Sequence, residues 1–159
     1  MFKSRTRIPV ILIVFGLAVS GVWFVVDAGD KSRKKAVETS NAPKAIGPYS
    51  QAIVADGFVF VAGQVGIDPK SGELVAGGIE AETEQALRNI EAVLKASDTD
   101  LENVVKTTIF LSDISDFAKV NEIYGRVFKA PFPARSTVQA ARLPRGAKIE
   151  IEVTALERK

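Results

Sequence analysis

The chain has 159 residues, of which 47% are hydrophobic, and its formal net charge is +2. This length suits one globular domain with an appended segment. The sequence contains no Cys and no His. Their absence excludes disulfides, redox thiols, Ser-His-Asp and Cys-His nucleophile systems and the usual zinc sites.

The positive charge is concentrated near the N-terminus. Residues 1–35 contain seven Lys or Arg and two Asp or Glu, whereas residues 36–159 contain fourteen and seventeen. The larger part of the chain therefore lacks the basic balance that favours nucleic acid. We expect no nucleic-acid partner.

An uncharged, mainly apolar run of 19 residues occupies positions 8–26. As a helix this run would extend about 28 Å, close to the thickness of a bilayer's hydrocarbon core. Residues 1–26 are therefore predicted to be a membrane anchor or a signal segment. The length of the run favours an anchor, whereas Val26-Asp27-Ala28 resembles a cleavage site.

Charged residues on both sides of the apolar run leave its orientation open. Lys3, Arg5 and Arg7 favour a cytoplasmic N-terminus and export of the domain, and the basic run at 31–35 opposes it. We expect a membrane-anchored or exported protein, with the extracytoplasmic side favoured. Residues 27–40 are polar, without apolar periodicity, and are predicted to be a tether.

Residues 41–159 are predicted to form one domain. Asp56-Gly57 is typical of a two-residue turn between paired strands. Helices are expected where apolar residues recur every three or four positions, and strands where they alternate. The elements expected in chain order are strands at Gln51–Val54 and Phe58–Ala62, a helix at Ile79–Ala96, a strand at Val104–Leu111, a helix at Phe117–Phe128, and strands at Arg135–Ala140 and Lys148–Leu156. This order, ββαβαββ, indicates an α+β class with a single sheet covered by two helices.

Each predicted helix carries a group of side chains that could be functional or merely structural. Glu80, Glu82 and Glu84 lie at the start of the first helix, where the helix dipole favours acidic residues, so we expect no metal site there. Phe117 and Tyr124 belong to an apolar stripe of the second helix. We interpret that stripe as core or subunit contact.

The last two predicted strands carry the candidate chemistry. The turn-rich loop Leu143–Gly146 is expected to bring these strands into one sheet, with Arg135 and Glu150 near each other at its polar face. An arginine there presents a planar charged fork that can bind a carboxylate. A glutamate can transfer a proton.

Several dispersed segments also carry a family resemblance. In chain order they are Asn41–Ser50 (NAPKAIGPYS), Ala62–Gln64 (AGQ), Asp68–Glu73 (DPKSGE), Val105–Thr108 (VKTT), Asp116–Asn121 (DFAKVN), Pro133–Ser136 (PARS) and Ile149–Ile151 (IEI). Together they resemble the Rid family, the reactive intermediate deaminases also called YjgF proteins. The resemblance implies a chorismate-mutase-like fold, assembled as a homotrimer with clefts between subunits. It also implies hydrolysis of small enamines and imines, such as 2-aminoacrylate, to 2-oxo acids and ammonia, without a metal or an organic cofactor.

The resemblance assigns roles to individual residues. Arg135 matches the arginine that binds the substrate carboxylate, and Glu150 matches the acidic residue that orients or activates water. Both are expected to be catalytic. Tyr49 and Asn121 are expected to bind substrate, Tyr49 by lining the cleft and Asn121 as a polar pocket residue. Gly63 is also expected to bind substrate, because a glycine in a strand permits a close approach of the backbone.

Two positions depart from the family pattern. Ala62 stands where many relatives carry Ser or Thr, which removes one hydroxyl group. Thr137 stands where many relatives carry Cys. Its hydroxyl is expected to contact substrate, although a hydroxyl is a poorer nucleophile than a thiol.

The sequence leaves other functions open. A protein of the same fold could bind a small carboxylate metabolite or a partner without turnover, which the changes at Ala62 and Thr137 would suit. An RNA-cleaving translation inhibitor is a further alternative, associated with some relatives and disfavoured by the acidic balance of the domain. Arg135 could instead form a structural ion pair, and Glu150 could be an ordinary solvent-facing strand residue.

Overall fold

The computed structural model of the protein describes residues 34–158. The predicted anchor or signal at 1–26 and the first part of the predicted tether lie outside these residues. Neither of the two described α-helices combines the length and the apolar character that crossing a membrane requires.

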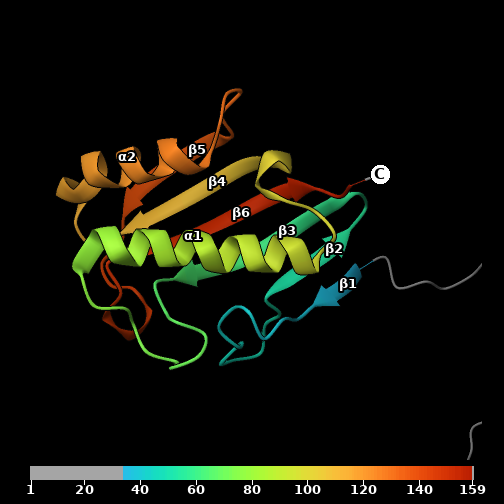
Figure 1. The fold of residues 1–159 in the computed structure, drawn as a ribbon, viewed down its shortest axis with the longest axis horizontal. Coiled ribbons are helices and arrows are strands. Elements are labelled where there is room, and N and C mark those ends of the chain that lie inside the picture. Colours follow the sequence, from blue (N-terminus) through green and yellow to red (C-terminus); the bar gives the residue numbers. More distant parts are fainter. Residues whose placement is uncertain (1–33, 159) are drawn as a thin grey trace, which may run out of the picture. The chain divides into compact units, whose positions relative to one another are not determined.

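The described chain forms one six-stranded sheet and two α-helices (Figure 1). The elements are β1 (Lys34–Val37), β2 (Ala52–Ala55), β3 (Phe58–Val65), α1 (Gly78–Ala96), β4 (Val104–Leu111), α2 (Phe117–Val127), β5 (Ala134–Gln139) and β6 (Ile149–Leu156). The strand order is β1-β2-β3-β6-β4-β5, and only β4 and β5 run parallel. The predicted α+β class, with one sheet and two helices, is confirmed.

Both helices cover the same face of the sheet, as Figure 1 shows. Strand β6 alternates accordingly: Ile149, Ile151 and Val153 are buried beneath the helices, while Glu150 and Glu152 point to the other face. Burial of each large aliphatic side chain contributes about 1.5–3 kcal/mol to folding. Helix α1 contributes its apolar face to this core through Ile79, Ala86, Leu87, Ile90, Val93 and Leu94.

The β2–β3 hairpin forms at the predicted turn, and a further strand joins it. Asp56 and Gly57 both have positive φ angles, 50° and 84°, which is the backbone of a type I′ turn. Strand β1 pairs antiparallel with β2 and buries Val37. Part of the range predicted as a tether, 27–40, therefore belongs to the sheet. Backbone pairing with β2 positions this lysine-rich strand, which has too few apolar residues to show a pattern.

The sheet face away from the helices has no covering layer among the described residues. Phe58 pairs with Leu156 and Phe60 with Thr154, and Val138 of β5 lies on the same face. Phe58, Phe60, Val138 and Leu156 are all exposed. We refer to these four apolar side chains as the open-face patch.

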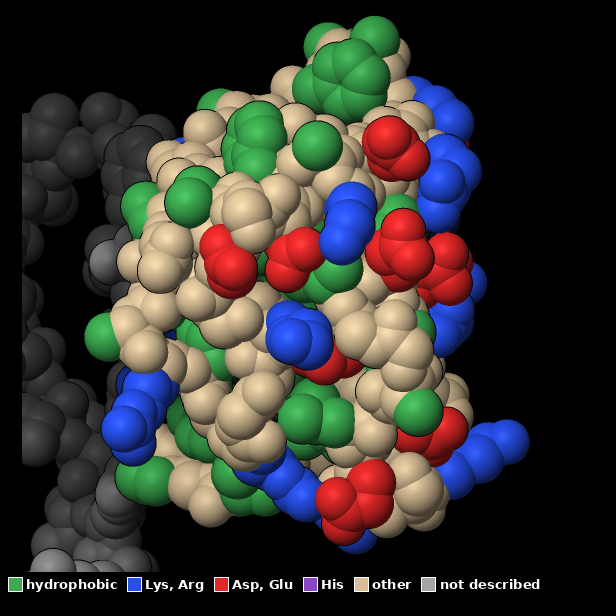
Figure 2. Space-filling view, turned by 90° about the vertical axis from the view of Figure 1, so that its left-hand side faces the viewer, with side chains coloured by type: hydrophobic (Ala, Val, Ile, Leu, Met, Phe, Trp, Pro, Cys, Tyr) green, Lys and Arg blue, Asp and Glu red, His purple; other side chains and the backbone are tan. Residues whose placement is uncertain are grey.

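Charges elsewhere on the surface are mixed. On the face shown in Figure 2, Asp and Glu side chains lie interspersed with Lys and Arg side chains. That face therefore shows no continuous basic patch of the kind that follows a nucleic-acid backbone.

Candidate active site

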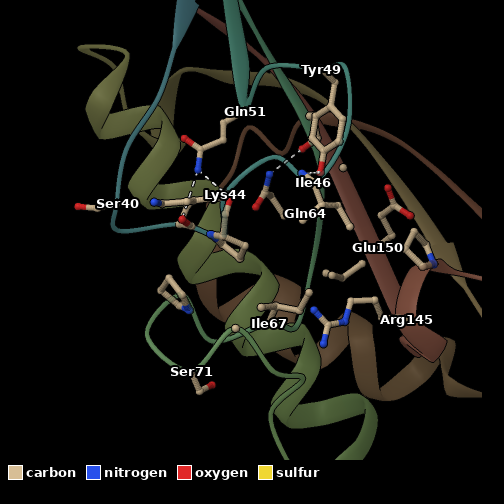
Figure 3. A pocket seen from close by; sticks show the side chains of 18 of the residues that line it. Ser40, Lys44, Ile46, Tyr49, Gln51, Gln64, Ile67, Ser71, Arg145 and Glu150 are labelled. Atoms are coloured by element: carbon tan, nitrogen blue, oxygen red, sulfur yellow. Dashed lines mark hydrogen bonds between the residues drawn. The ribbon is translucent and has the colours of Figure 1, made fainter.

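Three of the predicted site residues, Tyr49, Gly63 and Glu150, line one cavity of about 630 Å³ (Figure 3). Its walls come from the loop before β2, from β3, from the loop after β3 and from the start of β6. Among the described residues that line it, most of the surface is apolar and Glu150 is the one acidic residue. We call this space the Glu150 cavity.

A β-bulge places Gly63 directly beneath the Glu150 carboxyl group. The register between β3 and β6 shifts between Val61 and Gln64, so Ala62 and Gly63 together oppose one residue of β6. A Cβ atom added to Gly63 would lie 1.8 Å from Glu150 Oε1. The carboxyl group can therefore occupy this position only above a glycine, which agrees with the predicted close approach at Gly63.

The environment of Glu150 favours its protonated form. Burial raises the pKa of Glu150, and the nearby negative charge of Glu152 raises it further. Among the described residues, the Glu150 side chain forms no ion pair and no hydrogen bond. A half-buried carboxyl group that is free of partners and has a raised pKa is suited to proton transfer.

A fixed loop forms the wall that carries Tyr49. The buried Gln51 amide donates hydrogen bonds to the carbonyls of Thr39, Ala42 and Pro43, at 3.1, 3.2 and 2.7 Å, and accepts one from Thr39 N at 2.6 Å. The Tyr49 hydroxyl accepts a hydrogen bond from Ile46 N at 3.3 Å, and its ring is half exposed. Of these bonds, Figure 3 marks with dashed lines those that join residues lining the cavity.

An ion pair joins two loops at the rim of the cavity. Arg145, within the short 3-10 turn Pro144–Gly146, donates to Glu73 Oε2 at 2.9 Å. Arg145 also lines the cavity (Figure 3). This exposed pair links the loop after β3 to the loop before β6.

Arg135 lies outside this cavity, in a second group of side chains that we call the Arg135 cluster. On β5 it pairs with Thr107 of β4 and lies on the helix-covered face. Its guanidinium carbon lies 4.7 Å from the centroid of the Tyr124 ring and 5.5 Å from that of Phe117. Both distances are typical of cation–π contacts. The described residues place no carboxylate within ion-pair distance of Arg135, which leaves the alternative of a structural ion pair unsupported there.

Thr137 and Asn121 lie near Arg135 in the fold. Thr137 is two residues further along β5 and therefore on the same sheet face. Its Oγ1 is buried and has no hydrogen-bond partner among the described residues. Asn121 is half-buried on α2, three residues before Tyr124 and on the same side of the helix. The structure thus divides the predicted site residues into two groups of three.

The prediction that Arg135 and Glu150 lie near each other within one chain is wrong. Strand β4 separates β5 from β6, and the two residues point to opposite sheet faces. Arg135 pairs with the buried Thr107, whereas Glu150 pairs with Phe110. Period-2 alternation identifies each strand, but it does not determine which strands become neighbours.

Residues 39–157 match the family described as Endoribonuclease L-PSP. The chain belongs to this family.

The human 2-iminobutanoate/2-iminopropanoate deaminase is 52% identical over 124 residues, which cover 78% of this chain and 90% of that protein. Reactive Intermediate Deaminase A, chloroplastic, of Arabidopsis thaliana is 54% identical over 123 residues, 77% of this chain and 66% of that protein. A crystal structure from Yersinia pestis, described as a protein of unknown function of the conserved Rid family, is 51% identical with a TM-score of 0.75 and covers 77% of this chain and 98% of its own. The predicted resemblance to the Rid family is confirmed.

Several residues that shape the two groups were not predicted as site residues. No sequence motif predicts the roles of Gln51 and Arg145, because those roles depend on loops that meet only in the folded chain. Phe117 and Tyr124 were predicted only as part of an apolar stripe, and that stripe was the signal that could have led to them. The described residues contain no group of three or more acidic side chains placed to hold a metal ion.

Proposed function

We propose that this member of the Endoribonuclease L-PSP family hydrolyses 2-imino and enamino acids to 2-oxo acids and ammonia. Its relatives of about half identity include proteins named 2-iminobutanoate/2-iminopropanoate deaminase. The observation that carries the proposal is the state of Arg135. Its guanidinium group rests on two aromatic rings and has no carboxylate partner among the described residues, so its N–H groups are available for a substrate carboxylate.

The complete site is proposed to lie between two subunits of a homotrimer. Arg135 and Glu150 point to opposite faces of one sheet, so a single chain does not present both to one small substrate. Arg135 lies on an edge strand, where a neighbouring subunit can approach it. Three side chains of the open-face patch support association: Phe58 and Phe60 have ring centroids 6.1 Å apart, Phe58 pairs with Leu156, and adjacent exposed apolar side chains mark interaction surfaces.

In this arrangement Arg135 of one subunit binds the substrate carboxylate above the Glu150 cavity of its neighbour. Glu150 takes a proton from a water molecule as the water oxygen forms a bond to the imine carbon. The proton then passes to the amine nitrogen of the tetrahedral intermediate formed from the protonated imine. As the C–N bond breaks, the hydroxyl group of the intermediate gives its proton to the Glu150 carboxylate, so that ammonia leaves and a 2-oxo acid remains. The raised pKa of Glu150 makes its carboxylate a stronger base for the first step and its acid form available for the second.

The two sequence departures adjust this site. The Thr137 hydroxyl is buried and has no hydrogen-bond partner among the described residues, so we propose it as a contact for substrate. Ala62 lines the Glu150 cavity without a hydroxyl, so one hydrogen bond to substrate or water is lost there. That loss is the observation that favours the second candidate function, binding of a small carboxylate metabolite without turnover.

The apolar run at 8–26 is proposed to attach the domain to a membrane, with the extracytoplasmic side favoured. Fractionation of cells that express the full chain, with carbonate extraction of the membranes, tests this attachment. Protease protection of the domain in intact cells but not in spheroplasts would support export. Recovery of the full chain in the soluble fraction would reject the anchor.

The deaminase proposal is tested by following the decay of imino acids made in situ by an amino-acid oxidase, with semicarbazide as the competing trap. The full chain is expected to accelerate the decay. In Arg135→Ala we expect kcat/KM to fall by about 30-fold or more, because truncating one partner of a charged pair costs at least about 2 kcal/mol. Binding of a 2-oxo acid without acceleration of decay would support the binding module instead.

A further inference from the structure

We infer that Tyr124 and Phe117 are positioning residues for Arg135, and that they fix the plane of its guanidinium group for carboxylate binding. This inference rests on the proposed function, in which Arg135 holds the substrate. The two rings come from one helix, α2, and Arg135 comes from the adjacent edge strand β5. We call the pair of rings the aromatic platform.

The inner ring of the platform is held firmly in place. Tyr124 is 5% exposed, and its hydroxyl lies 3.0 Å from Thr107 Oγ1. Its ring packs against Phe128 with centroids 4.4 Å apart. Thr107 is also the residue that pairs with Arg135 across β4 and β5. The ring is therefore tied to the same strand position as the cation it supports.

The outer ring belongs to the same stripe of α2. Phe117, Asn121 and Tyr124 are spaced by four and three residues, which places all three on one side of the helix. The predicted pocket residue Asn121 therefore lies between the two platform rings along the helix. Phe117 is 39% exposed, so replacing it leaves the buried core intact.

A cation–π contact uses the face of the guanidinium group and leaves the N–H groups at its edge free. Those edge N–H groups are the donors that grip a carboxylate in a bidentate pair. A guanidinium group already held in one plane loses less conformational entropy on binding than a mobile one does. The platform thus improves carboxylate affinity without touching the substrate.

A double-mutant cycle tests this role by calorimetric titration of the full chain with 2-oxobutanoate, a stable product analogue of a small imino acid. Phe117→Leu is expected to weaken binding by about 2- to 30-fold, the range of one cation–π contact. Phe117→Tyr keeps a ring of the same size and is expected to retain wild-type affinity. In the Arg135→Ala background, Phe117→Leu is expected to have no further effect, since there is no cation left to position.

An unchanged Kd in Phe117→Leu would overturn the inference, and so would an equal loss of affinity with and without Arg135. Absence of 2-oxobutanoate binding to the wild type would also overturn it, by removing the carboxylate clamp. Tyr124→Phe, which keeps the ring and removes the bond to Thr107, is a second variant and is expected to have a smaller effect than Phe117→Leu. If the effect of Phe117→Leu on the Kd depends on Arg135 but the wild type does not hydrolyse imines, only the deaminase function is rejected. If the wild type hydrolyses imines but the effect of Phe117→Leu on the Kd does not depend on Arg135, only the role of the aromatic platform is rejected.

Discussion

The Glu150 cavity and the Arg135 cluster lie on opposite faces of the same sheet and are held by different forces. In the cavity, the Glu150 carboxyl group occupies space that is free because Gly63, in the β-bulge, has no side chain. In the cluster, the guanidinium group of Arg135 is held by contact with the rings of Phe117 and Tyr124. The position of the Glu150 carboxyl group thus depends on free space and burial, and the position of the Arg135 guanidinium group depends on aromatic contact.

The largest expected effect separates the chemical role of the cavity from the binding role of the cluster. Glu150→Gln keeps the shape of the side chain and removes its basicity, so kcat for imine hydrolysis is expected to fall by about 10²- to 10⁴-fold. The Kd for 2-oxobutanoate is expected to change little, because Arg135 supplies the carboxylate contact. Glu157→Gln is the control, with the same charge change after the end of β6. A variant of Glu150 that retains wild-type kcat would remove it from the reaction.

A smaller effect is expected when the space beneath the carboxyl group is filled. In Gly63→Ala the new Cβ would lie 1.8 Å from Glu150 Oε1, so the carboxyl group must move. We expect kcat to fall by about 10- to 100-fold, since a displacement of about 1 Å at a reacting group can cost that much. In a Glu150→Gln background the same change is expected to add little.

Gly125→Ala is the matched control for this substitution. Gly125 lies in α2, where an added Cβ would meet nothing within 4 Å. Its expected effect is a gain of about 0.5–1 kcal/mol in the free energy of unfolding, with unchanged kcat. Equal losses of activity in Gly63→Ala and Gly125→Ala would show that the fit beneath Glu150 is unimportant.

Local signals in the sequence predicted the elements of this fold well. The Asp56-Gly57 pair marked the hairpin turn because both residues tolerate positive φ, and the apolar periodicity located α1 and α2. Strand β1 was missed because its pairing is non-local and its sequence, KKAV, is mostly charged or small. The predicted proximity of Arg135 and Glu150 failed for a similar reason, since no local signal shows that β4 lies between β5 and β6.

The candidate site was predicted through motifs rather than through geometry. Motifs can name Arg135 and Glu150, but they do not show that the two belong to different sheet faces. They also do not show the aromatic platform, because an apolar helical stripe reads as core whether or not a cation rests on it. These features depend on which elements pack together, and only the folded chain shows that.

The smallest expected effect concerns the charge next to the cavity. The base form of Glu150 is required, so activity is expected to fall as the pH decreases through its raised pKa. Glu152→Gln removes a negative charge that favours protonation of Glu150, so the pKa of Glu150 decreases and the acidic limb of the pH–kcat profile moves to lower pH. Because burial is the larger cause of the raised pKa, most of the elevation is expected to remain. An acidic limb that does not move, or that moves to higher pH, would show that Glu152 does not repel the catalytic charge.

The most direct test of a site shared between subunits is complementation between two inactive variants. Arg135→Ala and Glu150→Gln chains are produced separately, mixed in equal amounts under conditions that allow subunits to exchange, and assayed for imine hydrolysis. If each site takes Arg135 from one subunit and Glu150 from its neighbour, every mixed trimer contains one intact site, and about a quarter of the wild-type activity is expected at random exchange. A mixture with confirmed subunit exchange that stays as inactive as its components would contradict the shared site.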